Sequence, residues 1–191
     1  MRESGILMHI TSLPTPYGIG TMGKDAYAFV DFLVKAGQRC WQILPLTPTG
    51  YGDSPYQSLG ACAGNHYLID LDTLVDEGLL KKEEIQDISW GNNPKRVDFG
   101  AMYAHRMNVL RLAFQRFAPD EAYETFVEQN RSWLEDYALF TALKDTLGGK
   151  PWLDWPEALR LRKADALAEK RRELSEEIRL QFFAQYEFDK Q

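Results

Sequence analysis

Two short apolar runs near the start of the chain, with an amphipathic segment between them, predict a strand–helix–strand unit. Residues 6–10 and 41–46 have the length of buried strands, and we expect the first to be buried on both faces. Between them, residues 25–36 carry apolar side chains at helical spacing, and Gly37 fits the position directly after a helix. The apolar side chains on one face of that helix are Ala26, Phe29, Val30 and Leu33. This order predicts parallel strands joined by a right-handed crossover.

A turn-rich stretch follows the second apolar run and leads into two brief elements. Prolines and a glycine end the run, and residues 50–58 form a loop. The chain resumes as a short strand over residues 67–71. Asp72 is then expected to cap a short helix that ends at Gly78, before a turn-rich connector at residues 90–94.

The second half of the chain is predicted to be a series of helices. The first carries an apolar stripe, which we expect to be core, made of Tyr103, Met107, Leu110, Phe114 and Phe117. Asp120 is expected to cap the second helix, and a capping-box pattern at Ser132 predicts the start of a third, which ends at glycines 148–149. A further capping box begins at Asp154, and the last helical stretch runs towards Tyr186 with a break near its middle.

The order of these elements limits the fold class to an α/β chain that is short of strands. Two strands and one helix, followed by roughly a hundred mainly helical residues, cannot close a sheet. A compact α/β domain needs more strands than this chain supplies.

Composition excludes several classes of partner. At 191 residues the chain is long enough for one domain with a proper core. Its net charge of −6 argues against nucleic acid and membranes as partners, and no stretch approaches the ~20 apolar residues of a membrane helix. Two cysteines, Cys40 and Cys62, form neither a disulfide framework nor a metal cluster. We therefore expect no cofactor or metal, a buried Cys40 thiol and a cytoplasmic location.

The loop after the second apolar run holds the side chains best suited to bind a ligand. Tyr51 and Tyr56 each offer an apolar face and a polar tip, which match the C–H face and the hydroxyl rim of a sugar ring. Asp53, Ser54 and Gln57 can form hydrogen bonds with that rim. The alternative is a turn-rich loop whose tyrosines pack against the domain, and spacing alone does not separate the two.

Residues 41–58 read WQILPLTPTGYGDSPYQS, a contiguous run that, apart from Thr47, resembles the signature of the 4-α-glucanotransferases, also called amylomaltases or disproportionating enzymes. The resemblance extends to SGILMHITSLP at 4–14, YGIG at 17–20, AGNHYLID at 63–70 and WLEDYALF at 133–140. It therefore covers the chain from residue 4. The chain departs from the family in having LGAC at 59–62, where a bulkier segment with an aromatic residue is usual, and His66, where proline is usual.

The resemblance implies a (β/α)8 barrel with a mainly helical lobe inserted after its second strand. Residues 1–48 would be the first strand–helix–strand of the barrel, residues 49–170 the substrate loop and helical lobe, and residues 171–191 a helix leading toward a missing third strand. We therefore expect an incomplete barrel, the N-terminal piece of a longer enzyme, with the remainder of its own barrel as a partner.

The resemblance also implies a reaction, the retaining transfer of α-1,4-glucan segments between malto-oligosaccharides. The family carries its nucleophile, its acid/base and its third carboxylate on later strands, so we expect no catalytic residue in this chain and no activity of the isolated piece. Tyr56 matches the tyrosine expected to stack on the sugar at the cleavage point, and Ser54 and Asp53 match the same loop. Tyr51 matches an aromatic residue near an outer glucan groove, and Tyr103 belongs either to that groove or to the core.

Two alternatives of a different class stay open at this point. The chain could be a non-catalytic α-glucan-binding module, or a helical interaction domain.

Overall fold

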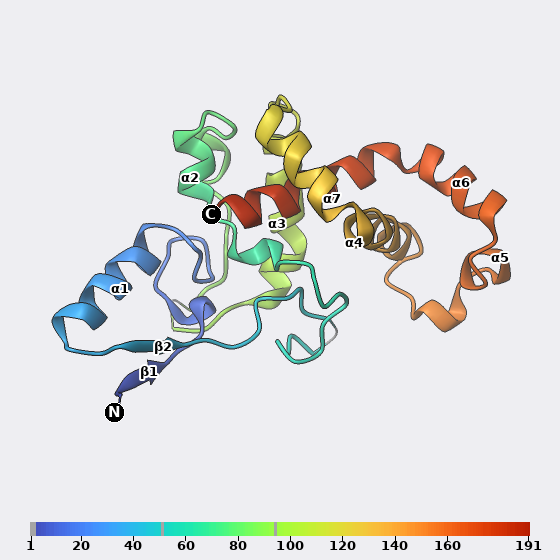
Figure 1. The fold of residues 1–191 in the computed structure, drawn as a ribbon. Coiled ribbons are helices and arrows are strands. Elements are labelled where there is room, and N and C mark those ends of the chain that lie inside the picture. The colour runs from blue at the N-terminus through green and yellow to red at the C-terminus, as the bar shows by residue number, and fades with distance from the viewer. Residues whose placement is uncertain (1–2, 51, 94) are drawn as a thin grey trace. The chain divides into compact units, whose positions relative to one another are not determined.

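The described part of the chain is mainly helical, with two parallel strands near its N-terminus (Figure 1). A computed structural model describes residues 3–50, 52–93 and 95–191. The strands are β1 (Gly5–Leu7) and β2 (Cys40–Gln42). The α-helices are α1 (Lys24–Lys35), α2 (Leu71–Asp76), α3 (Phe99–Phe114), α4 (Glu121–Thr146), α5 (Glu157–Arg160), α6 (Ala164–Glu173) and α7 (Ser175–Lys190). Single 3-10 turns are η1 (Ile10–Ser12), η2 (His66–Leu68), η3 (Lys82–Glu84) and η4 (Trp152–Asp154).

Strands β1 and β2 pair in parallel, which confirms the predicted direction. Leu7 lies opposite Gln42, and the indole Nε1 of Trp41 donates to the carbonyl of Met8 at 2.7 Å. Both strands are shorter than the predicted runs. The predicted burial of the first run on both faces is wrong, since Leu7 is 61% exposed. The prediction of a buried Cys40 thiol is also wrong, since Cys40 is exposed. Among the described residues the sheet has only these two strands, so little covers their side chains.

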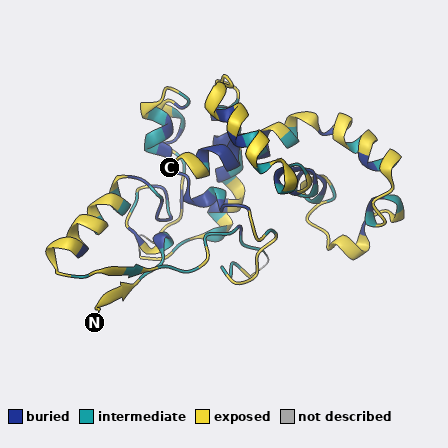
Figure 2. Cartoon of the chain, in the orientation of Figure 1, coloured by how far each residue is buried: buried dark blue, intermediate teal, exposed yellow. Residues whose placement is uncertain are grey.

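Helix α1 confirms the predicted helix to within one residue at each end. Gly37 follows it with a φ of +69°, the left-handed conformation that ends many helices. Leu33 is buried, and Phe29 packs edge-on against Trp41 with ring centroids 4.9 Å apart. Val30, predicted on the same face, is 44% exposed, and Figure 2 shows that much of α1 is exposed.

Residues 67–71 do not form the predicted strand but the end of η2 and the start of α2. The predicted cap of α2, Asp72, lies two positions too late, inside the first turn of the helix. The buried carboxylate of Asp70, not that of Asp72, accepts the N–H of Thr73 at 2.9 Å. Asp72 instead accepts a hydrogen bond from the buried hydroxyl of Tyr17. Asp72 therefore has a tertiary partner that local sequence could not reveal.

Helix α4 continues through the position where the sequence predicted a new helix. Asp120 caps it as predicted, accepting the N–H of Tyr123 at 2.8 Å. Ser132, predicted to cap a separate helix, lies exposed inside α4. Buried residues of the same helix lie on both sides of it, among them Phe126 and Leu134, so packing favours one unbroken helix.

The C-terminal helices agree with the predicted break but not with the predicted cap. Pro156 precedes α5 and supplies no side-chain capping bond, so the capping box predicted from Asp154 is wrong. The break in the last helical stretch is confirmed at Leu174, between α6 and α7. Within the described residues, we find no helix with the length and apolar character required to cross a membrane.

The chain divides into two compact units. The first comprises Met1–Phe117 with Glu187–Gln191, and the second comprises Ala118–Tyr186. One core cluster of the first unit contains Ile10, Leu13 and Leu68. The core of the second unit contains Leu139, Leu143, Trp155, Leu159 and Leu167. Each unit therefore has apolar packing of its own.

Candidate functional site

The candidate site is residues 50–58, which we call the tyrosine loop, in the first unit. Thr49 and Ser58 form an antiparallel bridge at its base, and the N–H of Gly50 donates to the carbonyl of Gln57 at 3.0 Å. Inside the loop, the N–H of Asp53 donates back to the carbonyl of Gly50 at 3.1 Å. These backbone bonds close the loop at its base.

Tyr56 lies at the exposed part of the tyrosine loop. Its side chain is 72% exposed, so it does not pack into the core. Its N–H donates to the Oγ of Ser54 at 3.3 Å, and the N–H of Gln57 donates to the carbonyl of Ser54 at 3.0 Å. Gln57 is exposed beside it. The predicted residue Tyr51 lies outside the described residues. The loop thus presents one open aromatic face with two hydrogen-bonding side chains close by.

Asp53 links the tyrosine loop to helix α3. Its φ of +58° is left-handed, which is uncommon for a residue other than glycine. Its carboxylate accepts a hydrogen bond from the hydroxyl of Tyr103. Partial burial, and then the bond to Asp53, raise the pKa of Tyr103 to about 12. The hydroxyl therefore remains a donor over the whole physiological range.

Tyr103 lies outside the core, whereas the predicted apolar stripe placed it inside. It is 53% exposed, and its ring meets that of Tyr67 edge-on with centroids 5.9 Å apart. The buried stripe of α3 instead includes Met102 and Arg106, one register position away. One side of Tyr103 is therefore supported by the first unit while its hydroxyl reaches the loop.

A buried cation on α3 was missed by sequence reasoning. Arg106 is fully buried, and its Nη2 donates to the carbonyl of Tyr67 at 2.7 Å. Its guanidinium also lies 5.4 Å from the ring centroid of Trp90. Burial lowers the pKa of Arg106 to about 10, so it stays charged at neutral pH. Its only signal in the sequence is its position four residues after Met102, within the buried stripe.

The Tyr103–Asp53 hydrogen bond is expected to order the tyrosine loop. Tyr103→Phe keeps the ring and removes the donor, so backbone amides of Gly50, Asp53 and Gln57 should exchange with solvent about five-fold faster, equivalent to roughly 1 kcal/mol. Hydrogen exchange followed by mass spectrometry measures this directly. Tyr27→Phe, the same change at a tyrosine 66% exposed on α1, is the matched control. Equal loop exchange in both variants would contradict the assigned role.

Comparison with known proteins finds similar sequences and structures along the whole chain. A family profile described as 4-alpha-glucanotransferase matches residues 8–191. The 4-alpha-glucanotransferase of Thermus thermophilus is 48% identical over 196 residues, which cover 100% of this chain and 38% of that protein. That of Clostridium butyricum is 46% identical over 183 residues, 95% of this chain and 38% of the relative. The chain thus spans 38% of the length of these curated relatives.

Solved structures match to a similar extent. The amylomaltase from Streptococcus agalactiae in complex with acarbose superposes with a TM-score of 0.95 at 47% identity, over 100% of this chain and 39% of that one. The amylomaltase from Corynebacterium glutamicum superposes with a TM-score of 0.71 at 17% identity, over 98% of this chain and 27% of that one. The second match extends the similarity of fold to a distant sequence.

Proposed function

The chain belongs to the 4-α-glucanotransferase family, and from this we propose that it supplies sugar-binding residues to an enzyme that transfers α-1,4-glucan segments between malto-oligosaccharides. The observation that carries the proposal is the open ring of Tyr56, held on a loop that is closed at its base. An aromatic face of this kind binds the C–H face of a sugar and excludes water from it. Transfer needs such exclusion, because an acceptor sugar must compete with water for the reactive intermediate.

We propose that β1, α1 and β2 are the first strand–helix–strand of a (β/α)8 barrel. The parallel register and the exposed apolar residues Leu7 and Val34 support this, because further strands and helices would cover them. In this proposal residues 1–48 belong to the barrel, residues 49–170 to the loop and helical lobe, and residues 171–191 lead to a third strand. Determining the gene sequence beyond Gln191 tests it, and an in-frame stop codon there would contradict it.

The proposed reaction is a double displacement that retains the anomeric configuration. One carboxylate attacks the anomeric carbon, a carboxylic acid protonates the leaving sugar, and the 4-hydroxyl of a second sugar then takes the glycosyl group. We assign neither acid to this chain. In this scheme Tyr56 stacks on the donor sugar, while Ser54 and Gln57 bind its hydroxyls. Asp53 holds the loop through Tyr103, and its remaining acceptor sites face the sugar rim; Tyr51 would line an outer groove.

Removal of the Tyr56 ring is expected to slow transfer. In the full-length protein Tyr56→Ala should lower kcat/KM for maltotriose by roughly 1–3 kcal/mol of barrier, or about 5- to 150-fold. Release of glucose and of longer oligomers from maltotriose gives the rate. Tyr56→Phe keeps the stacking face and should stay close to the unsubstituted protein. Unchanged kinetics in the alanine variant would remove Tyr56 from the site.

A second candidate function is a glucan-binding module without chemistry of its own. For these 191 residues alone it is favoured by the expectation that the reactive acids lie on later strands of the barrel. Incubating this chain with maltotriose separates the two, and we expect no glucose release. Binding of maltoheptaose without turnover would favour the module. Absence of binding would favour a helical interaction domain.

A further inference from the structure

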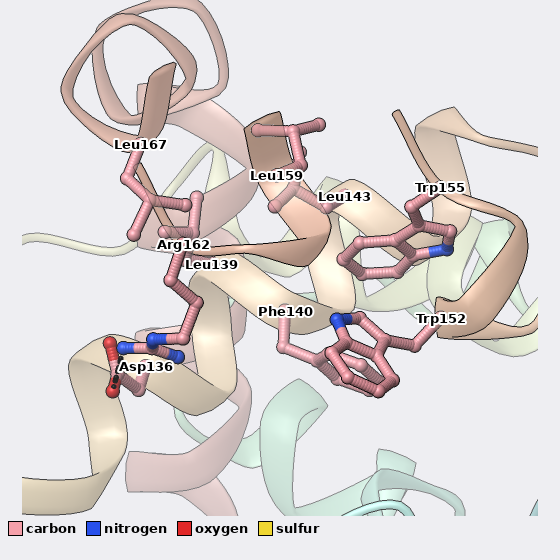
Figure 3. A pocket seen from close by; sticks show the side chains of 9 residues that line it. All are labelled: Asp136, Leu139, Phe140, Leu143, Trp152, Trp155, Leu159, Arg162 and Leu167. Atoms are coloured by element: carbon pink, nitrogen blue, oxygen red, sulfur yellow. Dashed lines mark hydrogen bonds and ion pairs between the residues drawn. The ribbon is translucent and has the colours of Figure 1, made fainter. Parts of the chain in front are cut away.

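A cavity in the second unit combines an aromatic wall with a charged one (Figure 3). Its volume is 310 Å³, within the range of small-molecule sites. All of its lining residues belong to the second unit, whereas the tyrosine loop belongs to the first. The proposed function makes no use of this cavity.

The aromatic wall consists of a buried, hydrogen-bonded tryptophan, Trp155, and a partly exposed one, Trp152. Trp155, 6% exposed, stacks on Phe140 with centroids 5.3 Å apart and an interplanar angle of 28°. Its Nε1 donates to the carbonyl of Lys150 at 3.1 Å, which fixes the ring. Trp152 lies on η4 and is 46% exposed, a large fraction for a tryptophan beside a cavity. The wall therefore offers a preformed apolar surface at little cost in side-chain entropy.

An ion pair forms another part of the lining. The carboxylate of Asp136, on α4, accepts from Arg162 at 2.7 Å and from Arg171 at 3.2 Å. In Figure 3 the paired Asp136 and Arg162 lie at the left, apart from Trp152 and Trp155 at the right. A guanidinium has five N–H donors and a carboxylate about four acceptor sites. The bond between the two uses a fraction of these, so both donors and acceptors remain at the cavity edge.

The backbone at Arg162 supports a specific role for its side chain. Its φ is +53°, and its N–H donates to the carbonyl of Leu159 at 3.0 Å just after α5. Glycine is the residue that adopts this conformation without steric cost. An arginine in this conformation has a steric cost that glycine would not have, and its side chain places a charged group at the cavity. Non-glycine residues in sparsely populated backbone conformations are found most often at functional sites.

We propose that this cavity is a second carbohydrate site, which binds a glucosyl unit of an α-glucan chain. A sugar ring meets both walls, its C–H face on Trp152 and its hydroxyls on Asp136 and Arg162. A wholly apolar ligand would leave the ion pair desolvated, whereas the hydroxyls of a neutral sugar can use the donors and acceptors that the pair leaves open. The inference rests on the proposed function for the identity of the glucan. Two sites on one protein can hold one polymer more tightly than either site alone.

Affinity electrophoresis of the full-length protein in native gels containing glycogen tests the site. Trp152→Ala is expected to raise the apparent Kd for glycogen at least about five-fold, while kcat/KM for maltotriose, a ligand too short to need a second site, stays within about two-fold. Leu153→Ala is the matched control, since Leu153 is a neighbour on η4, 65% exposed and outside the cavity lining. Equal migration of both variants and the unsubstituted protein would overturn the proposal.

A second measurement does not depend on whether the Trp152→Ala variant folds. The unsubstituted protein is labelled with 5-fluorotryptophan, and the ¹⁹F resonance of Trp152 is assigned from its loss in Trp152→Phe. Saturating maltoheptaose should shift that resonance, and a Trp152 signal unaffected by the sugar would overturn the proposal. If maltotriose turnover is absent from the unsubstituted protein, the proposed function fails. The Trp152 resonance still reports sugar binding in that case, so the two failures are distinguishable.

Discussion

Acidification from pH 7 to pH 4 is expected to remove roughly 3 kcal/mol of unfolding free energy through His66 alone. Burial, and then the nearby Arg106 cation, lower the pKa of His66 from 6.5 to about 4. Both ring nitrogens of His66 are buried and have no hydrogen-bond partner among the described residues. Above pH 6.5 the ring is neutral in the folded and the unfolded chain. As pH falls from there to the folded pKa, only the unfolded chain gains the proton, so stability decreases by about 1.4 kcal/mol per pH unit.

His66→Pro should remove this acid sensitivity. His66 is the first residue of η2, where a proline needs no N–H, and Asn65 before it has φ −77° and ψ 108°, which a following proline favours. Proline is also the residue that the family usually has there. Urea unfolding at a series of pH values should show a variant about 3 kcal/mol less destabilised by acid than the unsubstituted chain. His66→Gln removes the same proton site without a backbone change and should behave alike. Parallel pH profiles for all three proteins would show that His66 is not the buried group responsible.

Features fixed by a few neighbouring residues could be predicted from the sequence. The helix ends at Gly37, Gly78 and Gly148 were predicted, and each has a positive φ that glycine adopts at little cost. The cap at Asp120 was predicted for the same reason, since its partner is three residues away. Such interactions depend on local sequence alone, so local patterns identify them.

Features that depend on distant partners could not be predicted in this way. The capping-box pattern at Ser132 is real, but burial of Leu134 and its neighbours in one continuous helix outweighs it. The short apolar strand at β1 resembles a core strand, but burial depends on partners beyond the run itself. Arg106 occupies a core position because the carbonyl of Tyr67, 39 residues earlier, receives its hydrogen bond.

The same division runs through the candidate site. The turn at Gly50 and the open position of Tyr56 follow from glycine, proline and polar residues close in sequence. The hydrogen bond between Asp53 and Tyr103 spans 50 residues, and no pattern in either segment announces it. Local sequence therefore accounts for the turn and for the exposure of Tyr56, but not for the hydrogen bond that connects the loop to α3.

Gly20→Ala is expected to destabilise the first unit by at least about 3 kcal/mol. A Cβ at this position would overlap the carbonyl oxygen of Ile10 and would lie 2.8 Å from the backbone nitrogen of Leu13. The overlap is with backbone, which cannot rotate away as a side-chain tip can. The N–H of Gly20 also donates to the carbonyl of Thr11 at 3.0 Å, so separating the two segments would break that bond. Ile10 and Leu13 are both buried in one core cluster, so moving η1 would disturb that core too.

Gly37→Ala is the matched control, because it adds the same methyl group where nothing lies within 4 Å. Its cost comes from the left-handed φ of +69° alone and should be about 1 kcal/mol. Urea unfolding followed by far-ultraviolet circular dichroism compares the two variants in one assay. If Gly20→Ala costs no more than Gly37→Ala, the close approach of the two segments is not what requires glycine at position 20. If Gly20→Ala costs several times more, the close backbone contact between residues 4–14 and 17–20 is what requires glycine at position 20. The resemblance of these two segments to the family signature then has a steric cause.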